Sequence, residues 1–342
     1  MSINTPHPLK TCWDMSLNSV KADALNAAIH LGLFNTLSHA ATAGSVARQH
    51  QLDPKNTGYF LDILWSMALL ERHRETHDSE WRYCVDPVIA PFIQDESPLY
   101  CGQSLHFRLE TLRQFGSHLP AFLKNGSDIA VQSTNASWAE AAQAQIAQEQ
   151  NAVTARAALA CINELTDLKG NCRFLDLGGG PGKIAIAIAQ AHPSWTGEVF
   201  DLPETARVAE RTIREAGLEN RLTTRSGDIA ADNIGNRYDL VWCSSVLHFV
   251  PDISHTLHKV FAALSPGGYF VSVHAEIPPG REAAEKILPY YLPLLMRGRH
   301  VWPQGTLTAL LEETGFKICV NHEVRCFPVA PAQLIIGRKI SL

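Results

Sequence analysis

Hydrophobic positions recur with a helical period through the N-terminal part of the chain. Residues 20–37 place a set of apolar side chains near one helical face: Ala24, Leu25, Ala28, Leu31 and Leu33. Residues 42–71 then predict a short helix, a turn at Leu52–Pro54 and a second helix that runs through Leu70. In segment 72–93, polar turn residues separate two short candidate strands. This part of the chain is therefore predicted to be mainly helical, with a small hairpin.

Helix–turn–helix followed by a hairpin is the winged-helix pattern, which in other proteins binds DNA. A helix that enters a DNA groove needs cationic and polar side chains. The second helix has almost no Lys or Arg, and its apolar residues are Tyr59, Phe60, Leu61, Ile63, Leu64, Trp65, Met67, Leu69 and Leu70. So much apolar surface predicts packing against another element or another chain rather than against nucleic acid.

The pattern stays helical from Ser104 to about Leu165 and is broken at Lys124–Asp128. Residues 137–165 are rich in Ala and Gln and predict one helix or a pair of helices. No internal repeat or low-complexity tract stands out.

From Cys172 onward the period changes, and apolar runs of strand length alternate with helical segments. This alternation predicts an α/β domain with a doubly wound, mostly parallel sheet. At the end of the chain, 316–324 and 333–339 are strand-like runs separated only by a loop, which predicts an antiparallel hairpin at the sheet's edge. We expect one domain in residues 1–105 and a second, with a helical connector, in 106–342.

Composition narrows the class of protein. The chain has 342 residues, 46% of them hydrophobic, which is enough for a large core and two domains. Its 29 basic and 34 acidic residues give a net charge of −5, so the overall charge does not favour binding to nucleic acid. The 8 cysteines contain no C-x-x-C pair, which argues against a zinc cluster or a secreted disulfide scaffold. No apolar run approaches the ~20 residues that span a bilayer, and we expect a cytoplasmic protein without metal.

The segment FLDLGGGPGKIAIAIA places a strand, a glycine turn and a helix in immediate succession. Gly178, Gly180 and Gly182 permit a tight turn and a close approach of the backbone to a ligand. The helix that follows offers unpaired N–H groups at its N-terminus. Taken alone, the loop also satisfies a loose dinucleotide fingerprint, with Asp201 at about the expected distance.

One acid stands at or near the end of each of three consecutive strands. Asp176 lies inside its strand and would suit a cationic amino group, or order the loop, better than a pyrophosphate. Asp201 is placed to accept from both ribose hydroxyls, and Asp228 to accept from an adenine amino group while Ile229 covers the ring. Each acid alone could instead cap a turn or helix. All three in order suit a ligand with ribose, adenine and ammonium groups but no phosphate, and S-adenosylmethionine fits that description.

With these motifs, the chain resembles the class I S-adenosylmethionine-dependent methyltransferases, and among them the small-molecule O-methyltransferases of the caffeate, hydroxyindole and polyketide-tailoring type. FLDLGGGPGK, FDLPE, SGDI and VLHFVPD fall in the family's order and spacing. The resemblance covers nearly the whole chain and implies a winged-helix dimerisation domain, a helical connector and a Rossmann-like catalytic domain. It implies a homodimer through the N-terminal domain, and adds Leu202 and Ser244 to the cofactor-binding residues.

The resemblance also assigns a catalytic base. The family usually reads L-H-D-W where this chain has Leu247-His248-Phe249-Val250, and the histidine that removes the acceptor's proton maps onto His248. A family Glu that orients this histidine is replaced by His274, with Glu276 two residues on. Glu276 would point the same way as His274 if the strand continues. We therefore expect His248 to be the catalytic base, with His274 as a second catalytic group or polar partner.

Chemistry supports a histidine in this place, because a phenol with a pKa near ~10 is hardly ionised at neutral pH and a histidine with a pKa of ~6.5 can take its proton. The alternative, a structural histidine at a strand end, is common in proteins. Segment 287–303 matches the region that lines the family's acceptor pocket, and two prolines there would kink any helix. Predicted acceptor contacts, each of which could instead be a core or surface residue, are His106, Tyr290, Tyr291, Leu294, Met296 and His300.

The leading hypothesis is an O-methyltransferase that acts on a hydroxyl of a small aromatic or heteroaromatic metabolite in antibiotic or pigment biosynthesis. Transfer to nitrogen or carbon, or tailoring chemistry without methyl transfer, stays open within the same fold. A winged-helix regulator that senses S-adenosylmethionine and a nicotinamide-dependent dehydrogenase are the competing classes. DNA binding at low salt would support the regulator, and saturable NADH binding would support the dehydrogenase.

Overall fold

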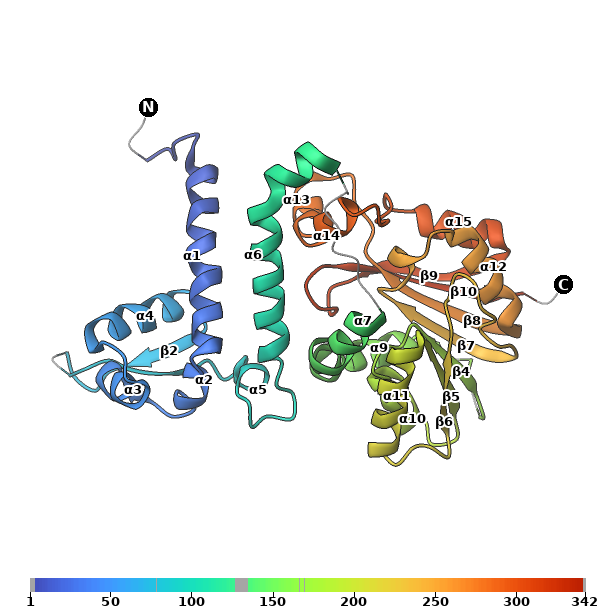
Figure 1. The fold of residues 1–342 in the computed structure, drawn as a ribbon, viewed down its shortest axis with the longest axis horizontal. Coiled ribbons are helices and arrows are strands. Elements are labelled where there is room, and N and C mark those ends of the chain that lie inside the picture. The colour runs from blue at the N-terminus through green and yellow to red at the C-terminus, as the bar shows by residue number, and fades with distance from the viewer. Residues whose placement is uncertain (1–3, 78, 127–134, 166, 169, 341–342) are drawn as a thin grey trace. The chain divides into compact units, whose positions relative to one another are not determined.

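The structure of the protein is a computed structural model, which describes residues 4–77, 79–126, 135–165, 167–168 and 170–340 (Figure 1). The packing of the backbone divides the chain into two units. The first unit is Met1–Gln114 and the second is Phe115–Leu342. The predicted domain boundary, after residue 105, falls in the same long helix as this division.

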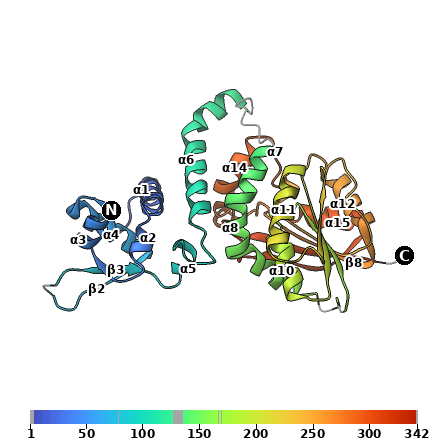
Figure 2. The same ribbon diagram turned by 60° about the horizontal axis from the view of Figure 1, so that its bottom comes forward.

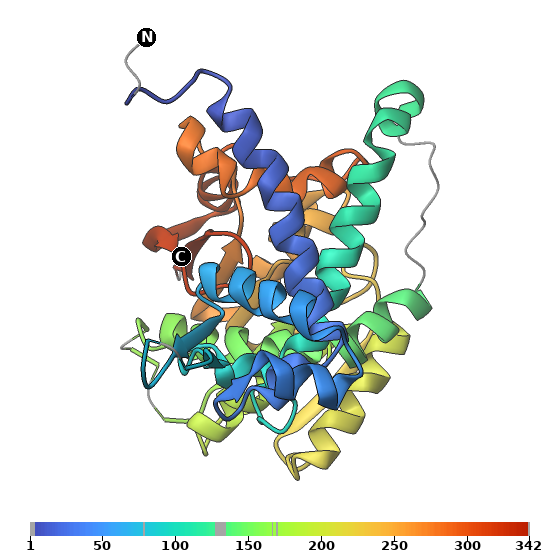
Figure 3. The ribbon, with the colours of Figure 1, turned by 90° about the vertical axis from the view of Figure 1, so that its left-hand side faces the viewer.

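The N-terminal unit is mainly helical, with a small sheet (Figure 3, blue ribbon). Its strands β1 (Ala41–Thr42), β3 (Arg82–Val85) and β2 (Leu70–His73) pair antiparallel in that order. Its helices are α1 (Lys10–His30), α2 (Leu33–Thr36), α3 (Ala43–His50), α4 (Pro54–Ser66), α5 (Ala90–Ile93) and the first part of α6 (Gly102–Asn125). The helix–turn–helix and hairpin predicted from the sequence are therefore present.

Local chemistry explains where α4 begins and ends. Pro54 stands in its first turn, and the Asp53 carboxylate caps it by accepting a hydrogen bond from Asn56 N at 2.8 Å. The prediction that this helix runs through Leu70 was wrong. Ala68 has a φ of +56°, a left-handed conformation that ends the helical path, and Leu70 already belongs to β2.

The core of the N-terminal unit absorbs part of the apolar surface of α4. Leu61 and Leu64 are fully buried in a cluster with residues of α1, α2 and β3. Tyr59 and Trp65 of the same helix remain exposed. The expectation that α4 packs against another element is thus confirmed for its inner face.

The C-terminal unit contains the last part of α6 and then a helical run that precedes the sheet in the chain. From Asn135 to Ile162 the run contains two π-helical stretches between its α-helical parts. These parts are α7 (Asn135–Ala141), η2 (Ala142–Ile146), α8 (Ala147–Glu149), η3 (Gln150–Thr154) and α9 (Ala155–Ile162). The predicted break at Lys124–Asp128 lies partly outside the described residues, and α6 ends at Asn125.

A seven-stranded sheet forms the centre of the C-terminal unit, in the order β6-β5-β4-β7-β8-β10-β9. The first five strands in this order pair parallel, and β10 pairs antiparallel with β8 and β9. The strands are β4 (Arg173–Leu177), β5 (Thr196–Asp201), β6 (Leu222–Ser226), β7 (Tyr238–Ser244), β8 (Leu264–His274), β9 (Phe316–Val324) and β10 (Ala332–Lys339). The predicted α/β class, parallel sheet and antiparallel edge hairpin are confirmed.

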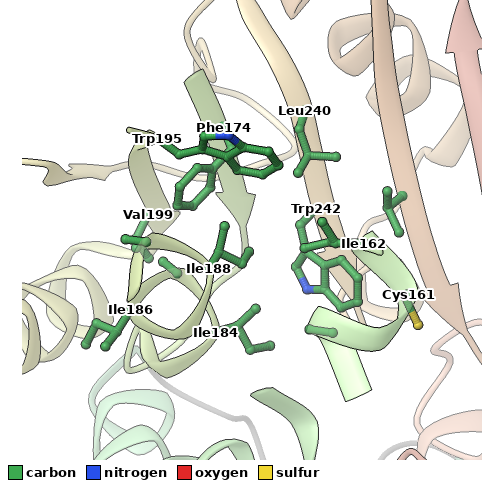
Figure 4. Close-up of a cluster of buried hydrophobic side chains, with 14 of the residues drawn as sticks. Cys161, Ile162, Phe174, Ile184, Ile186, Ile188, Trp195, Val199, Leu240 and Trp242 are labelled. Atoms are coloured by element: carbon green, nitrogen blue, oxygen red, sulfur yellow. The ribbon is translucent and has the colours of Figure 1, made fainter. Parts of the chain in front are cut away.

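Helices cover both faces of this sheet (Figure 2). On one face lie α9, α10 (Lys183–Ala191) and α11 (Pro203–Glu215), over a cluster that includes Phe174, Trp195 and Trp242 (Figure 4). On the other lie α12 (Ile253–Ala263) and α15 (Thr306–Thr314), over a second cluster. Two short helices, α13 (Arg281–Glu285) and α14 (Leu288–Leu295), precede α15 in the chain.

The strand order positions the functional site. From β4 the chain moves outward through β5 to β6, and it then returns to place β7 on the other side of β4. The order therefore reverses between β4 and β7. In open α/β sheets, ligands bind outside the carboxyl ends of the strands at such a switch point. The glycine loop follows β4, and the turn that carries His248 follows β7.

Candidate active site

The glycine loop folds closely onto its neighbours. Gly178, Gly180 and Gly182 have φ of +71°, +60° and +78°, conformations that side chains with a Cβ rarely adopt. A Cβ at Gly178 would lie 2.4 Å from Val246 Cγ2, in the loop after β7. A Cβ at Gly179 would lie 2.6 Å from Asp176 Oδ2. The loop therefore needs glycine both for its backbone path and for contact with Asp176 and Val246.

Asp201, the last residue of β5, holds the loop from the neighbouring strand. Its Oδ2 accepts a hydrogen bond from Gly180 N at 2.8 Å, and its Oδ1 accepts one from Leu202 N at 2.8 Å. Burial raises the pKa of Asp201 to about 6, against the lowering effect of these two bonds. Each carboxylate oxygen has a second lone pair, so the group can still accept from a ligand.

Asp176 is the most unusual carboxyl group of the site. It is 1% exposed, and its Oδ2 is buried with no hydrogen-bond partner among the described residues. Burial, together with the nearby charge of Asp201, raises its pKa to about 7. A cation delivered to this position would remove the cost of burying the ionised carboxylate.

The remaining predicted cofactor residues lie along the same edge of the sheet. Asp228 follows β6, is exposed, and accepts a hydrogen bond from Ala230 N at 2.8 Å with Oδ1. Ile229 is partly buried against the second cluster. Ser244 ends β7, and its Oγ accepts from Trp242 Nε1 at 3.2 Å. Asp176, Asp201 and Asp228 thus stand at or just beyond the ends of the adjacent strands β4, β5 and β6.

His248 lies in a 3₁₀ turn, η4 (Leu247–Phe249), and is 1% exposed. Its Nδ1 is 2.8 Å from the backbone oxygen of His300. Because a carbonyl oxygen only accepts, Nδ1 carries the proton and Nε2 keeps its lone pair. Nε2 is buried and has no hydrogen-bond partner in the described part of the chain. Burial lowers the pKa of His248 to about 4, which the bond to the His300 carbonyl opposes.

Aromatic rings surround the imidazole of His248. Trp302 stacks on it with a centroid distance of 5.5 Å and an interplanar angle of 22°. Tyr291 lies at 5.1 Å and His274 at 5.3 Å, both at steep angles. Trp302 was not among the predicted acceptor contacts, although it lies in segment 287–303. Its aromatic type was the available signal, but nothing in the sequence indicates its stacking partner.

His274 is fully buried at the end of β8, and both of its ring nitrogens are engaged within the protein. Nε2 accepts hydrogen bonds from Val246 N at 3.1 Å and Leu247 N at 3.0 Å. Nδ1 therefore carries the proton and donates to Ser272 Oγ at 2.9 Å. Burial, with His248 nearby, holds the pKa of His274 well below its usual value. This geometry corrects the expectation of a second catalytic group, because no ring nitrogen is left for a substrate.

Glu276 serves a different element from the one expected. Strand β8 ends at His274, so the strand does not continue to carry Glu276 beside it. The carboxylate of Glu276 instead accepts from Gly305 N at 2.9 Å and Leu307 N at 2.8 Å. These bonds satisfy free N–H groups at the start of α15. The role of orienting His248 belongs to the backbone carbonyl of His300.

The predicted acceptor residues fall in different places. Tyr290, Tyr291 and Leu294 belong to α14 and pack in one apolar cluster, in which Tyr291 also contacts His248. Met296 follows the helix and is partly buried. The His300 side chain is exposed, and its backbone holds His248.

His106 belongs to the N-terminal unit. Its Nδ1 is hydrogen-bonded to Asn26 Oδ1 at 2.7 Å, and its ring stacks on His30. Its predicted contact with the acceptor stays a prediction.

Gln150 is a site residue that sequence reasoning missed. It lies in η3 and is 7% exposed. Its amide bridges the glycine loop and the first residue of α10: Nε2 donates to Gly179 O at 3.1 Å, and Oε1 accepts from Lys183 N at 3.1 Å. No sequence signal marks it, because it is one of several glutamines in an Ala/Gln-rich segment.

Within the described residues, no group of three or more His, Cys, Asp or Glu side chains is arranged to hold a metal ion. None of the helices in that part of the chain is long and apolar enough to cross a membrane.

Two protein families match the chain. Residues 127–317 match the O-methyltransferase domain family, and residues 13–89 match the O-methyltransferase dimerisation domain family. The first match alone spans more than half of the chain. Together the two matches follow the division into two units.

Individual relatives extend the same likeness over the whole chain. The N,N-dimethyltransferase OxyT from Streptomyces rimosus is 28% identical over 310 residues, 87% of this chain and 88% of that protein. The tetracenomycin polyketide synthesis 8-O-methyl transferase TcmO from Streptomyces glaucescens is 25% identical over 327 residues, 92% of each protein. The crystal structure of human N-acetylserotonin methyltransferase in complex with SAM has a TM-score of 0.76 at 20% identity and covers 100% of both chains, which shows the shared fold.

Proposed function

Because the chain belongs to the O-methyltransferase family and carries both of its domains, we propose that it methylates a hydroxyl oxygen of a small aromatic or heteroaromatic metabolite. The chain is an S-adenosylmethionine-dependent methyltransferase. The observation that carries the choice of a hydroxyl acceptor is the buried Nε2 of His248, which has a free lone pair and a tautomer held by His300 O. The relative TcmO, which acts in tetracenomycin polyketide synthesis, supports a role in secondary metabolism.

The residues at the strand ends fit S-adenosylmethionine. We assign the ribose hydroxyls to Asp201, the adenine to Asp228 and Ile229, and the ammonium group to Asp176. The unpartnered, buried Oδ2 of Asp176 supports this assignment, because a cation would compensate its charge. The glycine loop contributes a close backbone approach, and Leu202 and Ser244 border the same edge of the sheet.

S-adenosylmethionine supplies an electrophilic methyl group on a sulfonium when it is bound. His248 then accepts the acceptor's proton at Nε2 while the oxygen becomes the nucleophile. The carbonyl of His300 stabilises the positive charge that develops on the ring, as an acceptor for the proton on Nδ1. The stacked Trp302 ring and the tilted Tyr291 ring keep water away from that charge.

The low pKa of His248 restricts the timing of proton transfer. A phenol with a pKa near ~10 gives its proton unfavourably to an imidazole whose pKa burial lowers to about 4. Full deprotonation before methyl transfer would therefore raise the barrier. We therefore propose that the proton moves as the carbon–oxygen bond forms, and that acidic hydroxyls react fastest.

Transfer to nitrogen is the second candidate, and the similarity to the N,N-dimethyltransferase OxyT favours it. A neutral amine already has a nucleophilic lone pair, so it can react before any base takes its proton. This candidate gives the neutral His248 a smaller part in the chemistry. The two candidates therefore differ in the acceptor atom and in their dependence on His248.

Matched acceptors test the choice. Purified protein is incubated with S-adenosylmethionine and pairs of bicyclic aromatic compounds that carry a hydroxyl or an amino group at the same position, and methylated products are quantified by mass spectrometry. The proposal predicts that O-methyl products dominate across the pairs and that rates rise with the acidity of the hydroxyl. Methylation of the amines alone would replace it with the second candidate.

We also propose that the protein is a homodimer through its N-terminal unit. The match of residues 13–89 to a dimerisation domain supports this assembly. So does the exposure of a set of large apolar side chains on or next to α1: Leu9, Trp13, Met15, Leu17 and Val20.

A further inference from the structure

The helical run Asn135–Ile162 contacts the glycine loop through one buried side chain. Gln150 donates from Nε2 to Gly179 O and accepts at Oε1 from Lys183 N, each at 3.1 Å. Only one orientation of the amide satisfies both contacts, because a carbonyl must receive a donor and an N–H must receive an acceptor. The two groups that Gln150 joins lie on either side of the loop's central turn.

One of the two contacts satisfies a backbone group that has no other partner among the described residues, and the other reinforces the turn of the loop. Lys183 is the first residue of α10, and the first N–H groups of a helix have no partner within the helix. Gly179 O already accepts from Gly182 N at 3.1 Å within the turn, and the Gln150 amide adds a second donor to it. Gln150 therefore closes the loop onto the start of α10 with a single side chain.

The backbone that carries Gln150 is itself unusual. Ala142–Ile146 and Gln150–Thr154 are π-helical, a conformation that is rare and often found at functional sites. A Cβ built on Gly180 would meet Ile146 Cγ2 and Gln150 Nε2, each at 3.5 Å. The π-helical turns therefore seat two side chains directly against the loop.

The same run also reaches the turn that carries the base. The ring of Trp138 in α7 packs edge-on against Phe249, with a centroid distance of 5.0 Å and an angle of 82°. Phe249 follows His248 in the chain. One helical run thus contacts the loop after β4 and the turn after β7, on both sides of the switch point.

We propose that Gln150 is a positioning residue for the cofactor, which holds the glycine loop in its binding shape from the π-helical run. The inference rests on the proposed cofactor site at this loop. By holding Gly179 O and Lys183 N, the amide restrains the backbone on both sides of Gly180, whose N–H donates to Asp201. Loss of the amide weakens cofactor binding without removing any group that touches the acceptor.

Three variants test this role: Gln150→Met, Gln150→Glu and the control Gln143→Glu, which changes an exposed glutamine in the same run. The affinity for S-adenosylhomocysteine is measured by calorimetry at pH 8.5 and pH 6, beside the wild type at each pH. Gln150→Met removes both hydrogen bonds at similar size. Gln150→Glu keeps an oxygen that can accept from Lys183 N, but at high pH it places an ionised carboxylate against Gly179 O.

We expect Gln150→Met to bind about tenfold more weakly than the wild type at both pH values, as the loss of one or two buried hydrogen bonds predicts. Gln150→Glu is expected to lose about tenfold at pH 8.5 but less than about threefold at pH 6, where a protonated carboxyl can donate to Gly179 O. The recovery is judged from the dissociation constant of the variant divided by that of the wild type at the same pH. This ratio cancels the effect of any group that titrates in both proteins. The KM for cofactor should rise while kcat changes little.

A ratio of dissociation constants, Gln150→Glu to wild type, that stays near one or does not change with pH would overturn the inference. This result can be obtained even if Gln150→Met fails to fold. An effect of equal size in Gln143→Glu would do the same. Failure of the wild type to bind S-adenosylhomocysteine would instead count against the proposed cofactor site.

Discussion

Single residues of the site are held in protonation states that burial selects. His248 and His274 are both neutral and both carry the proton on Nδ1. They differ at Nε2, which has no hydrogen-bond partner among the described residues in His248 and accepts from two backbone N–H groups in His274. Burial, together with the charge of Asp201, raises the pKa of Asp176 to about 7. Each state gives a measurable consequence.

Cofactor binding should depend on pH through Asp176. Its pKa of about 7 in the free protein means that a ligand ammonium group, which favours the carboxylate, must displace a proton at lower pH. The affinity for S-adenosylhomocysteine is therefore expected to fall about five- to tenfold between pH 8 and pH 6, with proton release on binding. Calorimetry in buffers of different ionisation enthalpy measures both. Asp176→Asn should bind weakly at pH 8 and lose this pH dependence, and a flat wild-type profile would contradict the assignment.

His274 should matter for turnover through the turn that it holds. His274→Ala leaves Val246 N and Leu247 N without an acceptor, at a cost of about 1–3 kcal/mol each. The free energy of unfolding and kcat are both expected to fall, while the affinity for S-adenosylhomocysteine stays within about threefold. His274→Gln, whose carbonyl oxygen can accept, should recover part of kcat. Unchanged turnover in a folded His274→Ala protein would remove the positioning role.

The sequence was sufficient to select His248 and the three acids as candidates, because each lies at or near the end of a recognisable strand. It could not indicate what orients His248. The partner is a backbone carbonyl 52 residues away, and a backbone group leaves no signal in residue type. His274 shows the converse: its type suggested chemistry, and only the contacts of its two nitrogens show that it is engaged.

Elements were predicted best where the hydrophobic period is strong. The strands β4 to β10 all appear where apolar runs predicted them, since a sheet covered on both faces requires such runs. The π-helical turns of the connector were not predicted, because their Ala/Gln composition suits any helix. The end of α4 was misplaced because the apolar pattern continues into β2.

One element-scale prediction concerns the start of α15. Glu276 is buried and accepts from Gly305 N and Leu307 N, so Glu276→Ala should cost about 2 kcal/mol of stability. Thermal unfolding followed by circular dichroism measures the loss. Glu313→Ala, at an exposed position of the same helix, is the control and should change stability by less than about 0.5 kcal/mol. Equal melting of the two variants would contradict the capping role.

At the scale of the whole molecule, the two units carry different features. The C-terminal unit contains the strand-end acids, the glycine loop and the buried histidines, and the N-terminal unit presents exposed apolar side chains on α1. Helix–turn–helix geometry alone could not decide between DNA binding and dimerisation. The match to a dimerisation domain favours the second.

The proposed dimer can be tested by placing charge on α1. Leu17 and Val20 are 56% and 54% exposed, and Leu17→Lys with Val20→Lys would put two cations into an apolar contact. Light scattering is expected to find a dimer for the wild type and a dissociation constant raised at least about tenfold for the double variant. The exposed His39→Lys is the control. A wild-type monomer at micromolar concentration would reject the assembly.

The most direct test of His248 as the neutral base is single-turnover methyl transfer to a phenolic acceptor at saturating S-adenosylmethionine, compared between the wild type and His248→Gln. The account predicts a rate about 10²- to 10⁴-fold lower for His248→Gln, with unchanged affinity for S-adenosylhomocysteine. It also predicts a wild-type rate whose acid limb lies below pH 6.5, since burial lowers the pKa of His248 to about 4. His255→Gln, an exposed histidine in α12, should behave as the wild type. A His248→Gln rate within about threefold of the wild type would contradict the assignment of the base.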